Sequence, residues 1–148
     1  MNWNVINNEK DLDEFNYDYG NFHDSVIKEI SFSSGGYVDE KLILNLTNNP
    51  VARFIFQSEC AATEYSVVEI EFSNIIQINI KPQEENYGGC FWIKDAEIYL
   101  DNGIFYFNEA DCAIQDSDKD DFTWISAKNV KWRMREDLLG HAPIYMKD

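Results

Sequence analysis

The chain has 148 residues, 45% of them hydrophobic and 15% aromatic, and its 27 Asp and Glu against 12 Lys and Arg give a formal net charge of −15. The hydrophobic share excludes a disordered chain, and the length predicts a single domain spanning residues 1–148. The charge repels nucleic-acid phosphates and anionic lipids, so we expect neither a nucleic acid nor a membrane as partner. Solubility alone is the simplest reason for such a charge, and a basic protein is the partner that it would attract.

Residues 9–19 are predicted to form a short helix. Leu12, Phe15 and Tyr19 recur at three- and four-residue spacing, which places them on one helical face, and a glycine follows them. The apolar period then shortens toward two, which predicts a strand over residues 25–33.

The next apolar segment alternates more regularly. The letters SSGGYVDE are typical of a turn, and in the following KLILNLTN the side chains of Leu42, Leu44 and Leu46 share one face. We therefore expect residues 41–48 to form a half-buried strand, paired as a hairpin with the strand at residues 25–33.

Two further strands are predicted before the middle of the chain. In the letters ARFIFQSE, Phe54 and Phe56 alternate with more polar residues and share one face. Residues 65–80 are rich in β-branched side chains, which favours a strand with a bend or bulge near Asn74 over a helix.

The clearest local signal lies in the second half of the chain. Asp101, Asn102 and Gly103 separate the apolar runs AEIYL and IFYFN, which is the composition of a hairpin turn. The letters FTWISAKNVKWRMRE predict a last strand, and the tail from Leu138, which contains Pro143, is expected to be loosely attached. Short strands with little helix between them predict an α+β, mostly β fold: a curled antiparallel sheet or sandwich with a short N-terminal helix.

The neighbours His23, Asp24 and Ser25 combine the residue types of a hydrolase triad. On an extended chain His23 and Ser25 point to one side and Asp24 to the other, whereas a triad requires all three side chains to converge. Asp24 is therefore interpreted as a turn or capping residue that accepts backbone N–H bonds, and His23 as a residue that either pairs with another carboxylate or lies in a polar groove. A polar site at His23 and Asp24 stays a hypothesis.

The cysteines indicate a reducing environment. Cys60, Cys90 and Cys112 are odd in number and have no short spacing, so they fit neither a disulfide framework nor a zinc site. The N-terminal residues lack the features of a signal peptide. We expect a cytoplasmic protein with no cofactor and no metal ligands.

Acidic residues concentrate in two predicted loops, where a protein partner would reach them. Asp116, Asp118 and Asp120 alternate like the first ligands of an EF-hand, but Asp121 stands where that loop needs glycine and Ala127 where it needs glutamate. The predicted partner-binding residues are Glu84, Glu85, Asp116, Asp118, Asp120 and Asp121.

The letters NFHDSVIKEISF, with Phe22, His23, Asp24, Ser25 and Ile27, resemble the N-terminal signature of bacterial immunity proteins of the type called immunity protein 50. The letters ISAKNVKWRMRE resemble the closing strand of that family. The resemblance implies a single-domain α+β protein that binds and neutralises a cognate toxin, and it carries over no catalytic residue.

The principal prediction is thus a non-enzymatic, immunity-like protein that binds a basic bacterial toxin domain. One alternative is a regulatory or assembly module that forms a homodimer through an exposed sheet edge. A second alternative is a small hydrolase or metal-dependent enzyme built around His23 and Asp24.

Overall fold

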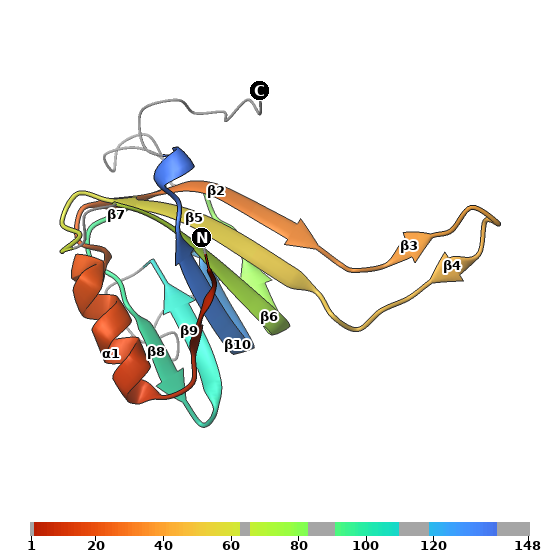
Figure 1. Ribbon diagram of the computed structural model, residues 1–148, viewed down its shortest axis with the longest axis horizontal. Helices are drawn as coiled ribbons and strands as arrows, with labels where there is room; N and C mark the ends of the chain where they lie inside the picture. Colours follow the sequence, from red (N-terminus) through yellow and green to blue (C-terminus); the bar gives the residue numbers. More distant parts are fainter. Residues whose placement is uncertain (1, 63–65, 83–90, 110–118, 139–148) are drawn as a thin grey trace.

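The structure, a computed structural model, describes residues 2–62, 66–82, 91–109 and 119–138. It is mostly β, with a strongly curled antiparallel sheet in the form of a half-barrel and one α-helix (Figure 1), which confirms the predicted fold class. The helical segments are α1 (Glu9–Asp18) and the short 3₁₀ turns η1 (Gly20–Phe22) and η3 (Glu136–Leu138). The strands are β1 (Asn4–Ile6), β2 (Ser25–Ser33), β3 (Tyr37–Val38), β4 (Leu44–Asn45), β5 (Val51–Ser58), β6 (Val67–Asn79), β7 (Trp92–Ile93), β8 (Ile98–Asp101), β9 (Ile104–Asn108) and β10 (Trp124–Met134).

The large sheet has the order β7-β2-β5-β6-β10-β9-β8, and β1 adds to β10. Every pairing in this sheet is antiparallel, so neighbouring strands need no helical crossover between them. No helix among the described residues has the length and apolar character needed to cross a membrane.

The N-terminal helix forms where its residue spacing predicts it. The side chain of Asn8 accepts a hydrogen bond of 3.0 Å from the backbone N–H of Asp11, which caps the first turn. Leu12 and Phe15 face the core, and Tyr19 just beyond the helix is completely buried. Gly20 ends the helix with φ of +60°, and a Cβ at this position would lie 2.4 Å from the Cys60 carbonyl oxygen.

The core lies on the inner face of the curled sheet and is dominated by aromatic rings. Phe54 and Phe56 of β5, Phe72 of β6 and Phe107 of β9 are all completely buried. Phe22 completes the group, with its ring centroid 4.9 Å from that of Phe56. These rings belong to one cluster with Leu12 and Phe15, so α1 covers part of the same inner face.

The bend predicted near Asn74 is confirmed. The register of β6 against β10 shifts between the pairs Ser126–Gln77 and Ala127–Ile75, which leaves Ile76 without an opposite residue. Asn74 has a φ of +51°. A bulge of this kind increases local twist, and here it lies where β6 curls.

The predicted hairpin and last strand are also confirmed. Asp101 pairs with Ile104, and Asn102 and Gly103 between them have φ of +50° and +78°. Positive φ at both central residues is the requirement of a tight type I′ turn. The last strand, β10, pairs with β6 over most of its length.

The expected hairpin of residues 25–33 with residues 41–48 is wrong. The strand β2 pairs with β5 along its whole length, from Ser25 to Ser33, and with β7 only at Ser25 and Val26, so the hairpin partner of β2 is β5 rather than residues 41–48. Residues 34–50 instead form an arm that projects from the sheet, in which β3 pairs only with β4 (Figure 1). The leucines of the arm are exposed rather than half-buried, because no other described segment covers them.

The expectation of a loosely attached tail is wrong at its first residue. Leu138 is buried with Ile55 and Val67 in a small second cluster. Its carbonyl oxygen accepts a hydrogen bond of 3.2 Å from Nζ of Lys28. The rest of the tail lies outside the described residues.

Candidate functional site

The segment of residues 20–24, which we call the hub, joins α1 to β2 in an unusual conformation. Gly20, Asn21, Phe22 and Asp24 all have φ between +47° and +60°. Non-glycine residues hold such angles only where the surrounding structure fixes them. Completely buried Phe22 is the apolar anchor that fixes this segment from the core side.

Backbone hydrogen bonds tie the hub to distant parts of the chain. The backbone N–H of Asp24 donates a hydrogen bond of 3.2 Å to the carbonyl oxygen of Lys94. The backbone N–H of Ala96 donates a hydrogen bond of 3.0 Å to the carbonyl oxygen of Asn21. The N–H of Glu59 donates to the Asp24 carbonyl oxygen at 3.3 Å. The hub therefore fixes the β5–β6 and β7–β8 connections beside the end of α1.

His23 lies at the surface of the hub between two carboxylates. Its Nδ1 is 2.7 Å from Oδ1 of Asp95, and its Nε2 is 3.5 Å from Oδ2 of Asp24, with 47% of the side chain exposed. The hydrogen bond and negative charge of Asp95, together with the charge of Asp24, raise the pKa of His23 above its ordinary value of 6.5. The prediction that His23 pairs with another carboxylate is confirmed.

The expected orientation of the His23-Asp24-Ser25 triplet is wrong. Asp24 has a φ of +47°, so the chain is not extended here and the carboxylate of Asp24 lies beside the His23 ring rather than opposite to it. Ser25 is buried while His23 is exposed, so the hydroxyl does not join the pair at the surface. Within the described residues, no group of three or more His, Cys, Asp or Glu side chains is arranged to hold a metal ion.

Backbone hydrogen bonds at and beside the hub bring together four segments of the chain that carry acidic residues. We call this surface the acidic end. It comprises Asp18 at the end of α1, Asp24 of the hub, Glu59 after β5, and Asp95 and Glu97 between β7 and β8. Sequence reasoning identified only Asp24 among them, because 72 residues of chain separate His23 from Asp95.

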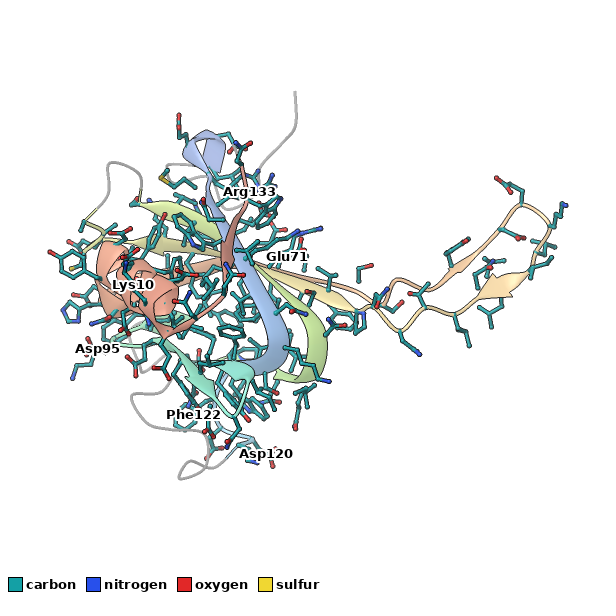
Figure 2. All side chains as sticks on the ribbon, turned by 60° about the horizontal axis from the view of Figure 1, so that its bottom comes forward. Lys10, Glu71, Asp95, Asp120, Phe122 and Arg133 are labelled. Atoms are coloured by element: carbon teal, nitrogen blue, oxygen red, sulfur yellow. The ribbon has the colours of Figure 1, made fainter. Side chains whose placement is uncertain are left out.

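The predicted partner-binding residues are only partly described. Asp120 and Asp121 lie in an exposed turn, which the Trp124 indole holds by donating a 2.8 Å hydrogen bond to the Lys119 carbonyl oxygen. Figure 2 shows Asp120 well apart from Asp95 on the surface, so this turn is not part of the acidic end. The remaining four predicted residues, Glu84, Glu85, Asp116 and Asp118, lie outside the described residues.

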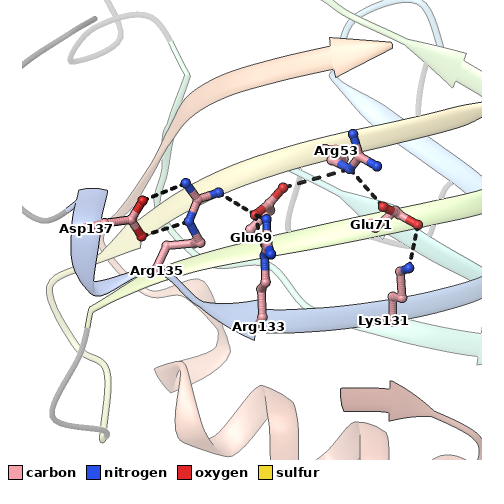
Figure 3. Close-up of polar contacts among 7 residues, drawn as sticks. All are labelled: Arg53, Glu69, Glu71, Lys131, Arg133, Arg135 and Asp137. Carbon is pink, nitrogen blue, oxygen red and sulfur yellow. Dashed lines mark hydrogen bonds and ion pairs between the residues drawn. The ribbon is translucent and has the colours of Figure 1, made fainter. Parts of the chain in front are cut away.

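The outer face of the sheet carries a set of charged residues that we call the ionic cluster (Figure 3). Its centre is Glu69 and Glu71 of β6, whose side chains are only 5% and 8% exposed. Its other members, from β5, β10 and the following turn, are Arg53, Lys131, Arg133, Arg135 and Asp137.

Each buried carboxylate of the ionic cluster has several cationic partners. Oε2 of Glu69 accepts from Nε of Arg133 at 2.7 Å and also from Nη1 of Arg135. Glu71 accepts from Nε of Arg53 at 2.8 Å and lies 2.9 Å from Nζ of Lys131. Burial raises the pKa of Glu71, but the hydrogen bonds from Lys131 and Arg53 outweigh it, so the pKa lies below its ordinary value.

The ionic cluster determines how charge is distributed over the rest of the molecule. It contains four of the twelve Lys and Arg but only three of the 27 Asp and Glu. The ring of Trp3 lies over both Lys131 and Arg133, 4.5 Å from each cation, and covers part of it. The chain outside the cluster therefore carries 24 acidic residues against eight basic ones.

Replacing Asp95 by Asn is expected to lower the pKa of His23 toward 6.5, because the main partner of the protonated ring loses its charge. Since folding raises this pKa, protonated His23 stabilises the hub fully below pH 6.5, and the contribution is lost as the pH rises through the folded-state pKa. An NMR titration of the imidazole signals, assigned with His23→Gln, measures the pKa of His23 in the wild type and in Asp95→Asn. Glu97→Gln is the control, and an unchanged His23 pKa in Asp95→Asn would contradict the assignment.

Comparison of the chain with protein-family models, with curated proteins and with solved structures finds no match in any of the three.

Proposed function

We propose that the chain is a non-enzymatic protein-binding module of the immunity-protein type, which binds and neutralises a basic bacterial toxin domain through the acidic end. The observation that carries this proposal is the separation of charge over the surface. Four cations are held around buried Glu69 and Glu71 on the outer face of the sheet, and the carboxylates of the hub region are left in excess at another place.

The geometry of the acidic end supports electrostatic recognition. Its acidic residues lie on segments that are joined at and beside the hub by backbone hydrogen bonds, so the relative positions of their backbones are set before a partner arrives. A field of one sign attracts a partner of opposite charge and increases its rate of association. Glu59 and Glu97 are exposed to solvent. The connection between β7 and β8 also carries one exposed basic residue, Lys94.

The resemblance of residues 22–27 to the immunity-protein signature is the reason for proposing a toxin domain as the partner. In this structure Phe22 anchors the hub in the core, and His23 and Asp24 lie at its surface. The residues of the signature therefore build the element from which the acidic end is assembled. This placement supports a role for the signature in positioning a binding surface.

The test is binding to whatever toxin domain the neighbouring genes encode, produced with its catalytic residue inactivated. The double variant Glu59→Gln/Glu97→Gln is expected to weaken binding by about tenfold, mainly through slower association. The wild-type affinity is expected to fall as NaCl is raised from about 50 to about 500 mM, because salt screens exposed charges. Surface plasmon resonance gives both rate constants.

The matched control is Glu29→Gln/Glu40→Gln, which removes the same charge from exposed positions on β2 and on the arm. It is expected to bind with nearly wild-type kinetics. Equal weakening by both double variants would show that net charge alone drives association. Absence of binding at low salt would overturn the proposed function.

A further inference from the structure

The arm carries six of the 13 large apolar residues that are exposed in the described part of the chain. Large apolar side chains stand open to solvent along both of its strands and at its tip, with Leu42 86% and Leu46 81% exposed. Its exposed apolar residues are Tyr37, Val38, Leu42, Ile43, Leu44 and Leu46. Contiguous exposed apolar surface of this kind marks an interaction site in a stable protein.

The second strand of the arm lies in an uncharged stretch of an acidic chain, whereas Asp39, Glu40 and Lys41 lie just before that stretch. Residues 42–52 form the longest stretch without an Asp, Glu, Lys, Arg or His. A basic partner would gain no charge complementarity from this stretch. A second copy of the chain, which also carries −15, is repelled everywhere except where uncharged segments meet.

An uncharged apolar surface of matching kind lies at one edge of the sheet. The strand β5 begins at Val51, opposite Ser73, so residues 74–79 of β6 extend beyond it. Among the described strands only β10 pairs with these residues, on their other edge. We call residues 74–79 the open edge; within and just beyond it, Ile76 and Ile80 are exposed.

The arm and the open edge do not meet within one molecule. Both begin where β5 and β6 separate, and Figure 2 shows the arm leaving the sheet in one direction while the distal half of β6 follows β10 in another. Each surface is therefore left without a partner of its own kind among the described residues.

We propose that two copies of the chain form a dimer by exchanging arms, so that the arm of each copy adds to the open edge of the other. Addition of a strand would pair the backbone groups of residues 74–79 that no described strand pairs on this edge, and Leu44 and Leu46 would pack against Ile76. The contact is made twice about a two-fold axis, so the assembly closes at two copies and does not extend into a filament.

This dimer goes beyond the proposed function, because it uses neither the acidic end nor a basic partner. The two associations also respond to salt in opposite directions. Screening weakens the attraction of the acidic end for a basic toxin, but it weakens the repulsion between two copies that each carry −15. Either proposal therefore fails independently of the other.

Sedimentation velocity of the full chain is expected to show a monomer–dimer equilibrium that shifts toward the dimer when NaCl is raised from about 50 to about 500 mM. The arm variant Leu44→Ser/Leu46→Ser and the edge variant Ile76→Gln are each expected to raise the dimer dissociation constant about tenfold or more. Tyr17→Ser on α1, which removes a side chain that is 75% exposed, is the control and should leave it unchanged.

Mixing the two variants distinguishes exchange of arms from pairing of arm with arm. A mixed dimer restores one intact contact, between the arm of the edge variant and the open edge of the arm variant, so the mixture is expected to associate more tightly than either variant alone. A chain that stays monomeric at all concentrations and salt levels would overturn the proposal. So would a dimer that depends on the arm but not on Ile76, or an arm that binds only a different protein.

Discussion

Phe107→Ala is expected to lower the free energy of unfolding by about 3–5 kcal/mol, the usual cost of removing a fully buried phenylalanine ring. Phe107 is completely buried on β9. Its ring centroid lies 5.1 Å from that of Phe56, 5.8 Å from that of Phe22 and 6.0 Å from that of Phe54. Removal of the ring leaves a cavity between the sheet and the hub, which the neighbouring rings fill only in part.

Urea unfolding followed by circular dichroism and by tryptophan fluorescence measures the loss. Domains of this size have free energies of unfolding of about 5–15 kcal/mol, so the variant would lose a large part of its stability. Phe32→Ala is the matched control, because Phe32 lies on β2 but is 54% exposed, and we expect a change within about 0.5 kcal/mol. A loss below about 1 kcal/mol in Phe107→Ala would mean that the aromatic cluster is not the centre of the core.

Glu69→Ala is expected to lower the free energy of unfolding by about 2–3 kcal/mol. The substitution leaves Arg133 and Arg135 close together without the carboxylate that both contact. The expected loss is smaller than for a fully buried pair, because the side chains of these arginines remain 28% and 20% exposed and solvent screens them.

The second buried carboxylate of the ionic cluster, Glu71, makes the stability of the wild-type protein depend on pH. The pKa of Glu71 lies below its ordinary value of 4.5, so its stabilising contribution is complete above pH 4.5 and is lost as the pH falls through the folded-state pKa. Urea unfolding of Glu69→Ala at neutral pH, and of the wild type between about pH 3 and 6, measures both effects. Glu136→Ala removes an exposed glutamate near the same strand and is the control; equal losses in the two variants would contradict a special role for Glu69.

The elements that could be predicted from the sequence are those whose conformation is determined by residues adjacent to one another in the chain. The turn at Asn102 and Gly103 requires only two positive φ angles, which these residue types favour, and it forms as expected. The bend at Asn74 follows in the same way from one residue that tolerates positive φ within a long β-branched run.

The arm could not be predicted because alternation alone does not specify what covers a face. Leu42, Leu44 and Leu46 have the pattern of a half-buried strand, but β5 is the strand that pairs with the whole of β2, and these leucines lie beyond it in the arm. Competition between strands for an edge depends on the whole sheet rather than on any window of sequence.

The candidate site was predicted only where its residues adjoin in the chain. His23 and Asp24 were identified as a polar pair, whereas Asp95, which raises the pKa of His23, lies on the β7–β8 connection. Glu69 and Glu71 lie within the run of residues 65–80 that is predicted as a strand, but their burial among cations depends on residues from β5 and β10. Contacts between segments so far apart carry no local signal.

The strand with the most neighbours in the sheet is also the last of the described strands to leave the ribosome. β10 pairs with β6 and β9, and β1 adds to it, yet all three precede it in the chain. Until β10 is synthesised, these strands have edges that lack hydrogen-bonding partners, and such edges promote aggregation. The sheet therefore closes only once β10 has been synthesised.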